Sequence, residues 1–175
     1  MDIIEKGYEA LLKKIDEMDQ KRDTLTDEIR AHEADLMARM GEMTGPLVGR
    51  IGMNMLMRGK QDTKGEMYDT AFYPKKMILL GKTDPIEHRP DDINKKVVDQ
   101  FCVLSEEGKF FELMYSSDGM IVDSYQNPLS PADALQIYGH DIMVMLYRAM
   151  RDYLEGQKDL LDAMEKTIAF ALAGK

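Results

Sequence analysis

Residues 97–126 read VVDQFCVLSEEGKFFELMYSSDGMIVDSYQ, and they carry the strongest β-strand pattern of the chain. Three runs rich in β-branched and aromatic residues are separated by Ser105-Glu106-Glu107-Gly108 and by Asp118-Gly119. Both separators are turn signals, and Asp-Gly favours a type I′ hairpin because both central residues of that turn take a positive φ. The stretch therefore predicts three consecutive antiparallel strands, a β-meander.

A long helix is predicted before the meander, over residues 1–41. Apolar or tolerated residues alternate at spacings of three and four, the pattern of a coiled-coil seam. Two polar residues, Arg22 and His32, interrupt this seam. Polar residues at such positions often fix the register or the number of partners, and the alternative is that both side chains reach solvent at the edge of the stripe. The seam consists of Tyr8, Leu11, Ile15, Met18, Arg22, Leu25, Ile29, His32 and Leu36.

Residues 42–66 read as a connector rich in glycine and methionine, ahead of the sheet. Thr44-Gly45-Pro46 predicts a turn, and Pro46 the start of a short helix that ends near Arg58. The chain has 16 methionines, and methionine-rich surfaces adapt to varied partners because the side chain is flexible. We expect this segment to bind a partner protein, and the alternative is that its side chains fill the core beneath the sheet. The candidate partner-binding residues are Leu47, Met53, Met55, Leu56 and Met57.

The sheet is expected over residues 67–127. A second long helix is expected over residues 130–173, with Gly139 and Gly156 as the positions where it could bend. Ser130 is a favourable N-cap, Pro131 suits the first helical position, and Asp133 places a negative charge at the positive end of the helix dipole. An apolar stripe follows as far as Leu172. The predicted fold class is α+β, a single domain over residues 1–175 in which long N-terminal and C-terminal helices flank a small antiparallel β-meander.

Composition limits the class of partner and the compartment. The net charge of −9 and the pI near 4.9 disfavour nucleic acid, because an acidic chain repels phosphate backbones. Cys102 is the single cysteine, so the sequence predicts no intrachain disulfide. The N-terminus lacks the pattern of a signal peptide, and no apolar run reaches the ~18 residues of a membrane span. We expect a cytoplasmic protein that does not span a membrane.

Chemical motifs give little support for catalysis. The candidate metal ligands His32, His88, His140 and Cys102 are scattered, without the spacing of a metal site. Cys102 falls within a predicted strand, where a cysteine is usually a small inert hydrophobe. We therefore assign no catalytic residue, no metal and no cofactor. The alternative is a small-ligand or cofactor-binding domain, with or without enzyme activity, that has a pocket between sheet and helices. The candidate pocket residues are Tyr68, Tyr73, His88, Arg89 and Tyr115.

The order of long helix, small β unit and long helix is similar in outline to prefoldin-type chaperone subunits. That resemblance implies an acidic coiled-coil protein that assembles through its β structure and holds unfolded chains. The leading hypothesis from the residues themselves is a noncatalytic interaction protein, an accessory, regulatory or assembly factor that forms a homo-oligomer. The identity of its protein partner does not follow from the sequence.

Overall fold

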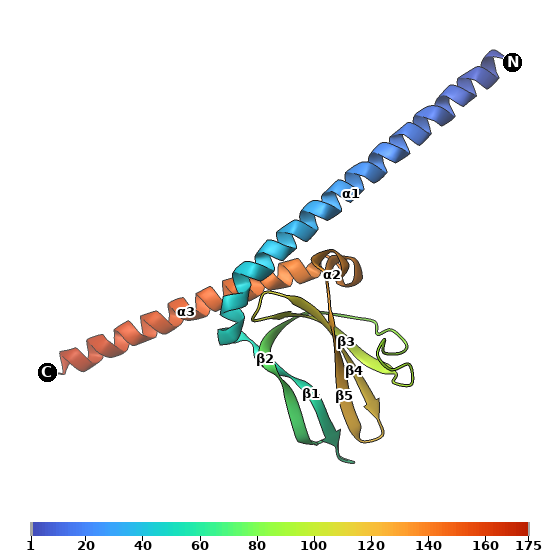
Figure 1. Cartoon of the computed structure of the whole chain (residues 1–175). Coiled ribbons are helices and arrows are strands. Elements are labelled where there is room, and N and C mark those ends of the chain that lie inside the picture. Colours follow the sequence, from blue (N-terminus) through green and yellow to red (C-terminus); the bar gives the residue numbers. More distant parts are fainter. Residues whose placement is uncertain (1, 175) are drawn as a thin grey trace.

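Helices at both ends of the chain flank a five-stranded antiparallel sheet, which confirms the predicted α+β class. The computed structural model describes residues 2–174. Figure 1 shows the sheet at the centre, with a long helix leaving it at each end of the chain. The elements are α1 (Ile3–Ile51), β1 (Met53–Gln61), β2 (Met67–Thr83), β3 (Val97–Ser105), β4 (Phe110–Asp118), β5 (Ile121–Pro128), α2 (Pro131–Tyr138) and α3 (Asp141–Ala173).

The sheet closes into a barrel in which each strand pairs with the next and β1 pairs with β5. The predicted meander of β3, β4 and β5 is confirmed. The barrel closes where β1 pairs with β5, with Arg58 opposite Asp123. Successive residues of β3 point to opposite faces. Val103 therefore packs inside the barrel with Met77 and Leu113, while Cys102 and Leu104 pack outward beneath the helices.

Helix α1 reaches ten residues further than predicted, to Ile51 rather than Gly41. Its second half buries Met37, Thr44 and Val48 against the barrel and the other helices, and this burial holds the helix together across Pro46. The predicted connector over residues 42–66 is therefore wrong as a description of structure. Its first part is the end of α1, so the helix expected from Pro46 is present as far as Ile51. The part expected to continue as helix to Arg58 is instead strand β1.

The C-terminal helix predicted as one element is divided into α2 and α3. The N-cap of α2 is confirmed: the Ser130 hydroxyl accepts a hydrogen bond of 3.1 Å from the backbone N–H of Asp133, with Pro131 at the first helical position. The break falls at Gly139, whose φ of 77° lies in the region that favours glycine. Helix α3 then starts in a new direction and buries Ile142 and Leu146 in the core beneath the barrel.

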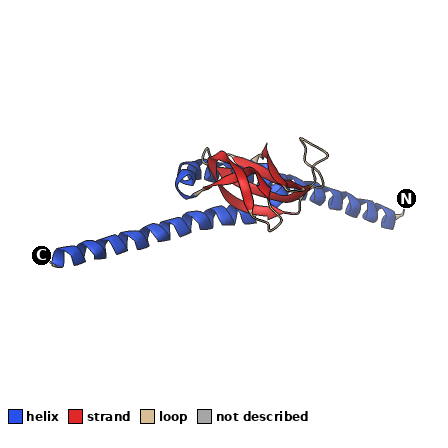
Figure 2. Cartoon of the chain, turned by 90° about the horizontal axis from the view of Figure 1, so that it is seen from below, coloured by secondary structure: helices blue, strands red, loops and turns tan. Residues whose placement is uncertain are grey.

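Two arms leave the barrel in opposite directions, as both views show (Figures 1 and 2). The N-terminal arm is residues 2–32 of the chain, and the C-terminal arm is residues 154–174. Almost every residue of both arms is exposed. Helices α1 and α3 pack together only near the barrel, so the arms diverge. None of the helices within residues 2–174 combines the length and the apolar character that a membrane crossing requires.

Candidate interaction surface

An exposed apolar stripe runs along the N-terminal arm and continues past it on α1. Its members follow the predicted spacing of three and four, and they lie away from the buried residues Met37, Gly41 and Thr44. Met18 is 71% exposed and Met43 is 70% exposed, so the stripe stays open from one end of the helix almost to the other. The α1 stripe consists of Ile4, Tyr8, Leu11, Ile15, Met18, Leu25, Ile29, Leu36 and Met43.

A second stripe with the same spacing runs along α3. The sequence pattern predicts an apolar stripe on this helix, but it does not show which residues of the stripe remain exposed. The α3 stripe has one polar interruption, Gln157, which is exposed like its neighbours. Leu160 and Leu172 widen it on either side. The α3 stripe consists of Tyr147, Met150, Leu154, Gln157, Leu161, Met164 and Ile168, of which Met150 is half-buried and the others are exposed.

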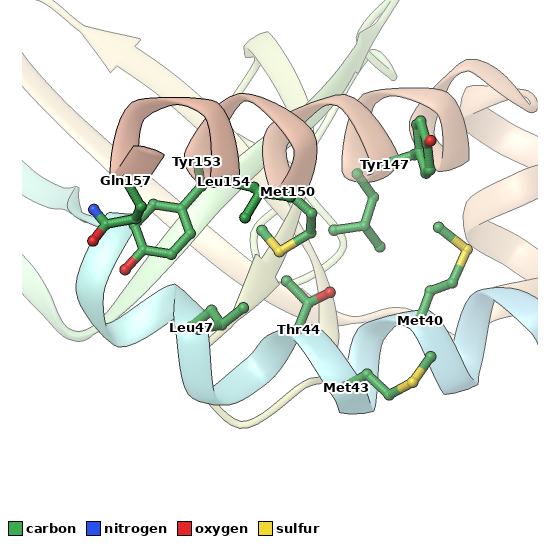
Figure 3. Close-up of a pocket in the computed structure, with 10 residues that line it drawn as sticks. Met40, Met43, Thr44, Leu47, Tyr147, Met150, Tyr153, Leu154 and Gln157 are labelled. Atoms are coloured by element: carbon green, nitrogen blue, oxygen red, sulfur yellow. The ribbon is translucent and has the colours of Figure 1, made fainter. Parts of the chain in front are cut away.

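The two stripes meet in a groove between the end of α1 and the start of α3. Its volume is about 460 Å³. Figure 3 shows the lining side chains, which come from both helices and are mostly apolar. Met43 of the α1 stripe and Tyr147, Met150 and Leu154 of the α3 stripe all belong to the lining. The exposed apolar surface is therefore continuous from the N-terminal arm, through the groove, to the C-terminal arm. The remaining lining residues are Met40, Thr44, Leu47, Leu146, Tyr153 and Gln157.

The five candidate partner-binding residues are distributed over different surroundings. Leu47 lines the groove, and Met53 and Met57 are exposed on β1. Met55 packs inside the barrel, and Leu56 is half-buried. Register shifts along the β1–β2 ladder break the simple alternation of faces on this strand. The segment is thus neither wholly an exposed surface nor wholly core.

The five candidate pocket residues also lie in different surroundings. Tyr73 and Tyr115 pack inside the barrel, where the Tyr115 hydroxyl donates a 2.9 Å hydrogen bond to the Leu56 carbonyl. Burial raises the pKa of Tyr115 to about 12. Tyr68 is half exposed on β2, and His88 forms an isolated bridge with Lys96 in the loop after β2. The predicted pocket is not formed by these side chains together.

Arg89, the remaining pocket candidate, is the centre of an ionic cluster. It is only 5% exposed, and its Nη1 lies 2.8 Å from Asp123 Oδ1 while its Nε lies 2.9 Å from Asp91 Oδ1. Lys95 also pairs with Asp123. The hydrogen bond and charge of the Arg89 guanidinium hold the pKa of Asp91 below its usual range. The cluster ties the loop after β2 to strand β5, which is a structural role.

A buried carboxylate, Glu112, lies on the face of the barrel beneath α2. It accepts hydrogen bonds of 2.9 Å from Gln100 Nε2 and 2.9 Å from the Tyr138 hydroxyl. Burial first, and then the nearby carboxylate, raise the pKa of Tyr138 well above its usual range. Burial likewise raises the pKa of the Cys102 thiol to about 12. Sequence analysis missed this group, although an acid inside the apolar run of residues 110–114 was a signal for it.

Both donors to Glu112 are protein side chains, so the group serves to anchor α2 on the sheet. Across residues 2–174, His, Cys, Asp and Glu side chains form no group of three or more that could hold a metal ion. Within residues 2–174, exposed large apolar side chains follow one another at helical spacing along α1 and α3. In comparisons with known proteins, the chain matches no family model, no curated protein and no solved structure.

Proposed function

We propose that this chain is a noncatalytic protein-interaction protein, an accessory or assembly factor that binds a protein partner through the α1 stripe, the α3 stripe and the groove between them. The observation that carries the proposal is the continuous exposed apolar surface along both arms. Large contiguous apolar surfaces on a folded chain usually mark a site of protein interaction. The glycine- and methionine-rich segment contributes to this surface through Met43, Thr44 and Leu47.

The free energy of burying a stripe favours binding of a protein partner over an arm that stays exposed to solvent. Burying one Leu, Ile or Met side chain contributes about 1.5–3 kcal/mol, and association costs about 4–15 kcal/mol. A partner that covers most of one stripe gains enough to overcome that cost. An isolated helix in water is only marginally stable, so each arm also becomes more stable when a partner packs against it.

A second candidate is the binding of a small apolar ligand in the groove. Its volume of about 460 Å³ is in the range of ligand sites, and Thr44, Tyr153 and Gln157 provide a few polar groups among apolar ones. This candidate leaves the outer parts of both stripes exposed, so it accounts for less of the surface.

The proposal is tested by purifying the tagged full chain from its own cells under native conditions. The wild type is compared with a variant in which three stripe residues of the N-terminal arm are changed, Leu11→Ser, Ile15→Ser and Met18→Ser. A control variant carries Lys13→Ser, Glu17→Ser and Gln20→Ser, which lie on the other faces of the same arm. All six positions are exposed and remote from the barrel, so each variant should keep the barrel's cooperative melt.

We expect the wild type and the control to purify as a stoichiometric assembly, with itself or with another protein, and the stripe variant to purify alone. The proposal is wrong if the wild type purifies as a single chain without a stoichiometric protein. A bound small molecule in that single chain would support the second candidate instead.

A further inference from the structure

The polar interruptions of the α1 stripe, Arg22 and His32, lie ten residues apart. In α3 the single polar interruption, Gln157, lies ten residues after Tyr147, a stripe member whose hydroxyl can form hydrogen bonds. Tyr147 is amphipathic and lines the groove, and Gln157 is the polar member of the α3 stripe. An antiparallel pairing reverses the order of one helix. The register that places Arg22 opposite Gln157 therefore also places His32 opposite Tyr147.

We propose that the partner of the interaction surface is a second copy of this chain, and that the N-terminal arm of each copy packs antiparallel along the α3 stripe of the other. This inference rests on the proposed function and names its partner. In the pairing, Arg22 lies opposite Gln157 of the second copy, and His32 lies opposite Tyr147 of the second copy.

The same register places apolar residues opposite apolar residues in two layers between these polar layers and in three layers on the side toward the N-terminus of α1. Each stripe alternates three and four, so successive members of α1 meet successive members of α3 in layers, as in an antiparallel coiled coil. The apolar layers, α1 residue first, are Leu11 with Ile168, Ile15 with Met164, Met18 with Leu161, Leu25 with Leu154 and Ile29 with Met150.

The polar layers can form hydrogen bonds. The Arg22 guanidinium contacts Asp19 at 2.9 Å and Asp23 at 3.1 Å on its own helix. An arginine has five N–H donors, so others remain for the side-chain carbonyl of Gln157. Next to this layer, the register brings Asp19 to the flank where Lys158 of the second copy lies. The register thus places one pair of opposite charges beside the seam.

In this pairing, the N-terminal arm of the second copy binds in the groove. Leu25 and Ile29 of the second copy meet Leu154 and Met150, which line the groove opposite Met43 and Leu47 of α1. The groove then becomes the contact among three helices, which explains why its lining is apolar on both walls.

The arrangement of the arms suits a twofold symmetric dimer. The arms point in opposite directions from the barrel, so one chain cannot pair its own arms (Figure 2). A twofold axis that passes near the groove brings each N-terminal arm beside the C-terminal arm of the other copy. The paired segments, 8–32 and 147–171, have equal length, about 37 Å at 1.5 Å per residue.

Pairing two copies of α1 with each other covers less of the exposed apolar surface than the proposed pairing. A parallel, in-register pair would place Arg22 against Arg22 in the seam. An antiparallel α1 pair that matches Lys14 with Asp35 and Lys21 with Glu28 would place Arg22 opposite Leu25 and His32 opposite Ile15. Both α1 pairings leave the α3 stripe uncovered.

Cysteine cross-linking between two different proteins tests the register. One protein carries Arg22→Cys and the other Gln157→Cys, and Cys102 stays in place because it is fully buried. The two are purified separately, mixed, allowed to exchange and oxidised mildly. A Met164→Cys protein is the control partner for Arg22→Cys, since it lies on the same face but one heptad away. Circular dichroism melts establish that each variant is folded, and light scattering gives its mass.

We expect a cross-linked dimer that needs both Arg22→Cys and Gln157→Cys and disappears on reduction. Neither protein alone, nor Arg22→Cys with Met164→Cys, should cross-link to a comparable extent. Cross-linking of Arg22→Cys with itself would overturn the inference in favour of α1 pairing. A dimeric mass without the mixed cross-link would overturn the register but leave the proposed function standing. A monomeric mass at all concentrations would show that the partner is not a second copy. If a different stoichiometric protein is then captured from cells, the proposed function stands and only this inference is wrong.

Discussion

A Cβ atom built on Gly45 would lie 2.7 Å from the backbone nitrogen of Gly108, so helix α1 and the β3–β4 turn meet at backbone contact distance. Gly108 has a φ of 74°, and a Cβ on it would lie 2.9 Å from the carbonyl oxygen of Gly41. These three glycines fix α1 against the barrel. Because the helix is rigid, this contact also sets the direction of the N-terminal arm.

We predict that Gly45→Ala lowers the free energy of unfolding by about 1–3 kcal/mol, since backbone atoms must move to admit the methyl group. The control is Gly7→Ala in the N-terminal arm, where a Cβ would meet nothing within 4 Å. That change should be neutral or favourable, because alanine has a higher helix propensity than glycine by about 1 kcal/mol. Urea denaturation followed by circular dichroism measures both, and equal effects would argue against the close contact.

The same glycines explain where the sequence-based prediction of α1 failed. Glycine often ends a helix and proline often begins one, so the pattern predicts a helix end at Gly41, a turn at Gly45 and a new helix from Pro46. In the structure the glycines permit close packing, and the burial of Met37 and Val48 outweighs the local cost of Pro46. Such a contact depends on a turn some sixty residues away in sequence, so no local pattern reveals it.

We predict that Tyr138→Phe destabilises the fold by about 1–3 kcal/mol, because it leaves the buried Glu112 carboxylate short of one donor. The matched control is Tyr68→Phe, since Tyr68 is half exposed on β2. That change should stay within about 0.5 kcal/mol of the wild type. Thermal and urea unfolding provide the comparison. A loss of equal size in both variants would show that the Glu112 hydrogen bond contributes nothing specific.

We predict that the Cys102 thiol does not react with a thiol reagent at pH 8 while the protein is folded. Burial raises its pKa to about 12, so the thiolate that reacts is scarce, and the side chain is also fully buried. Labelling should follow unfolding and become complete in denaturant. Rapid stoichiometric labelling of the native protein would contradict the buried position on β3.

We predict that Asp91→Asn weakens the acid sensitivity of the protein. Arg89 holds the pKa of Asp91 below its usual range, so its stabilising contribution is fully present above the pKa of the unfolded state, about 3.9, and is lost as the pH falls through the lower folded value. The variant should be less stable than the wild type at pH 7, and the difference should shrink below about pH 4. The exposed Asp84→Asn serves as control, and an unchanged difference down to pH 2 would contradict the pairing.

The central strands of the sheet could be predicted from the sequence, but the closure of the sheet into a barrel could not. Strands β3, β4 and β5 follow from local runs and turns, since Asp118-Gly119 lies between two β-rich segments. The pairing of β1 with β5 joins residues such as Lys60 and Ile121, which only the closed barrel brings together. Likewise, the apolar seam of α1 was evident, but its divergence from α3 depends on the glycine contact at one end and the break at Gly139 at the other.

The most direct test of the account is the mass of the purified chain in solution, measured by light scattering over a range of concentrations. The comparison is between the wild type, Ile29→Asp in the α1 stripe and Gln20→Asp on an outer face of the same arm, two variants that add the same charge. We predict twice the chain mass of 20.0 kDa for the wild type and Gln20→Asp, and a single chain for a folded Ile29→Asp. A wild type that remains a single chain at every concentration would contradict the claim that the two stripes dock a second copy.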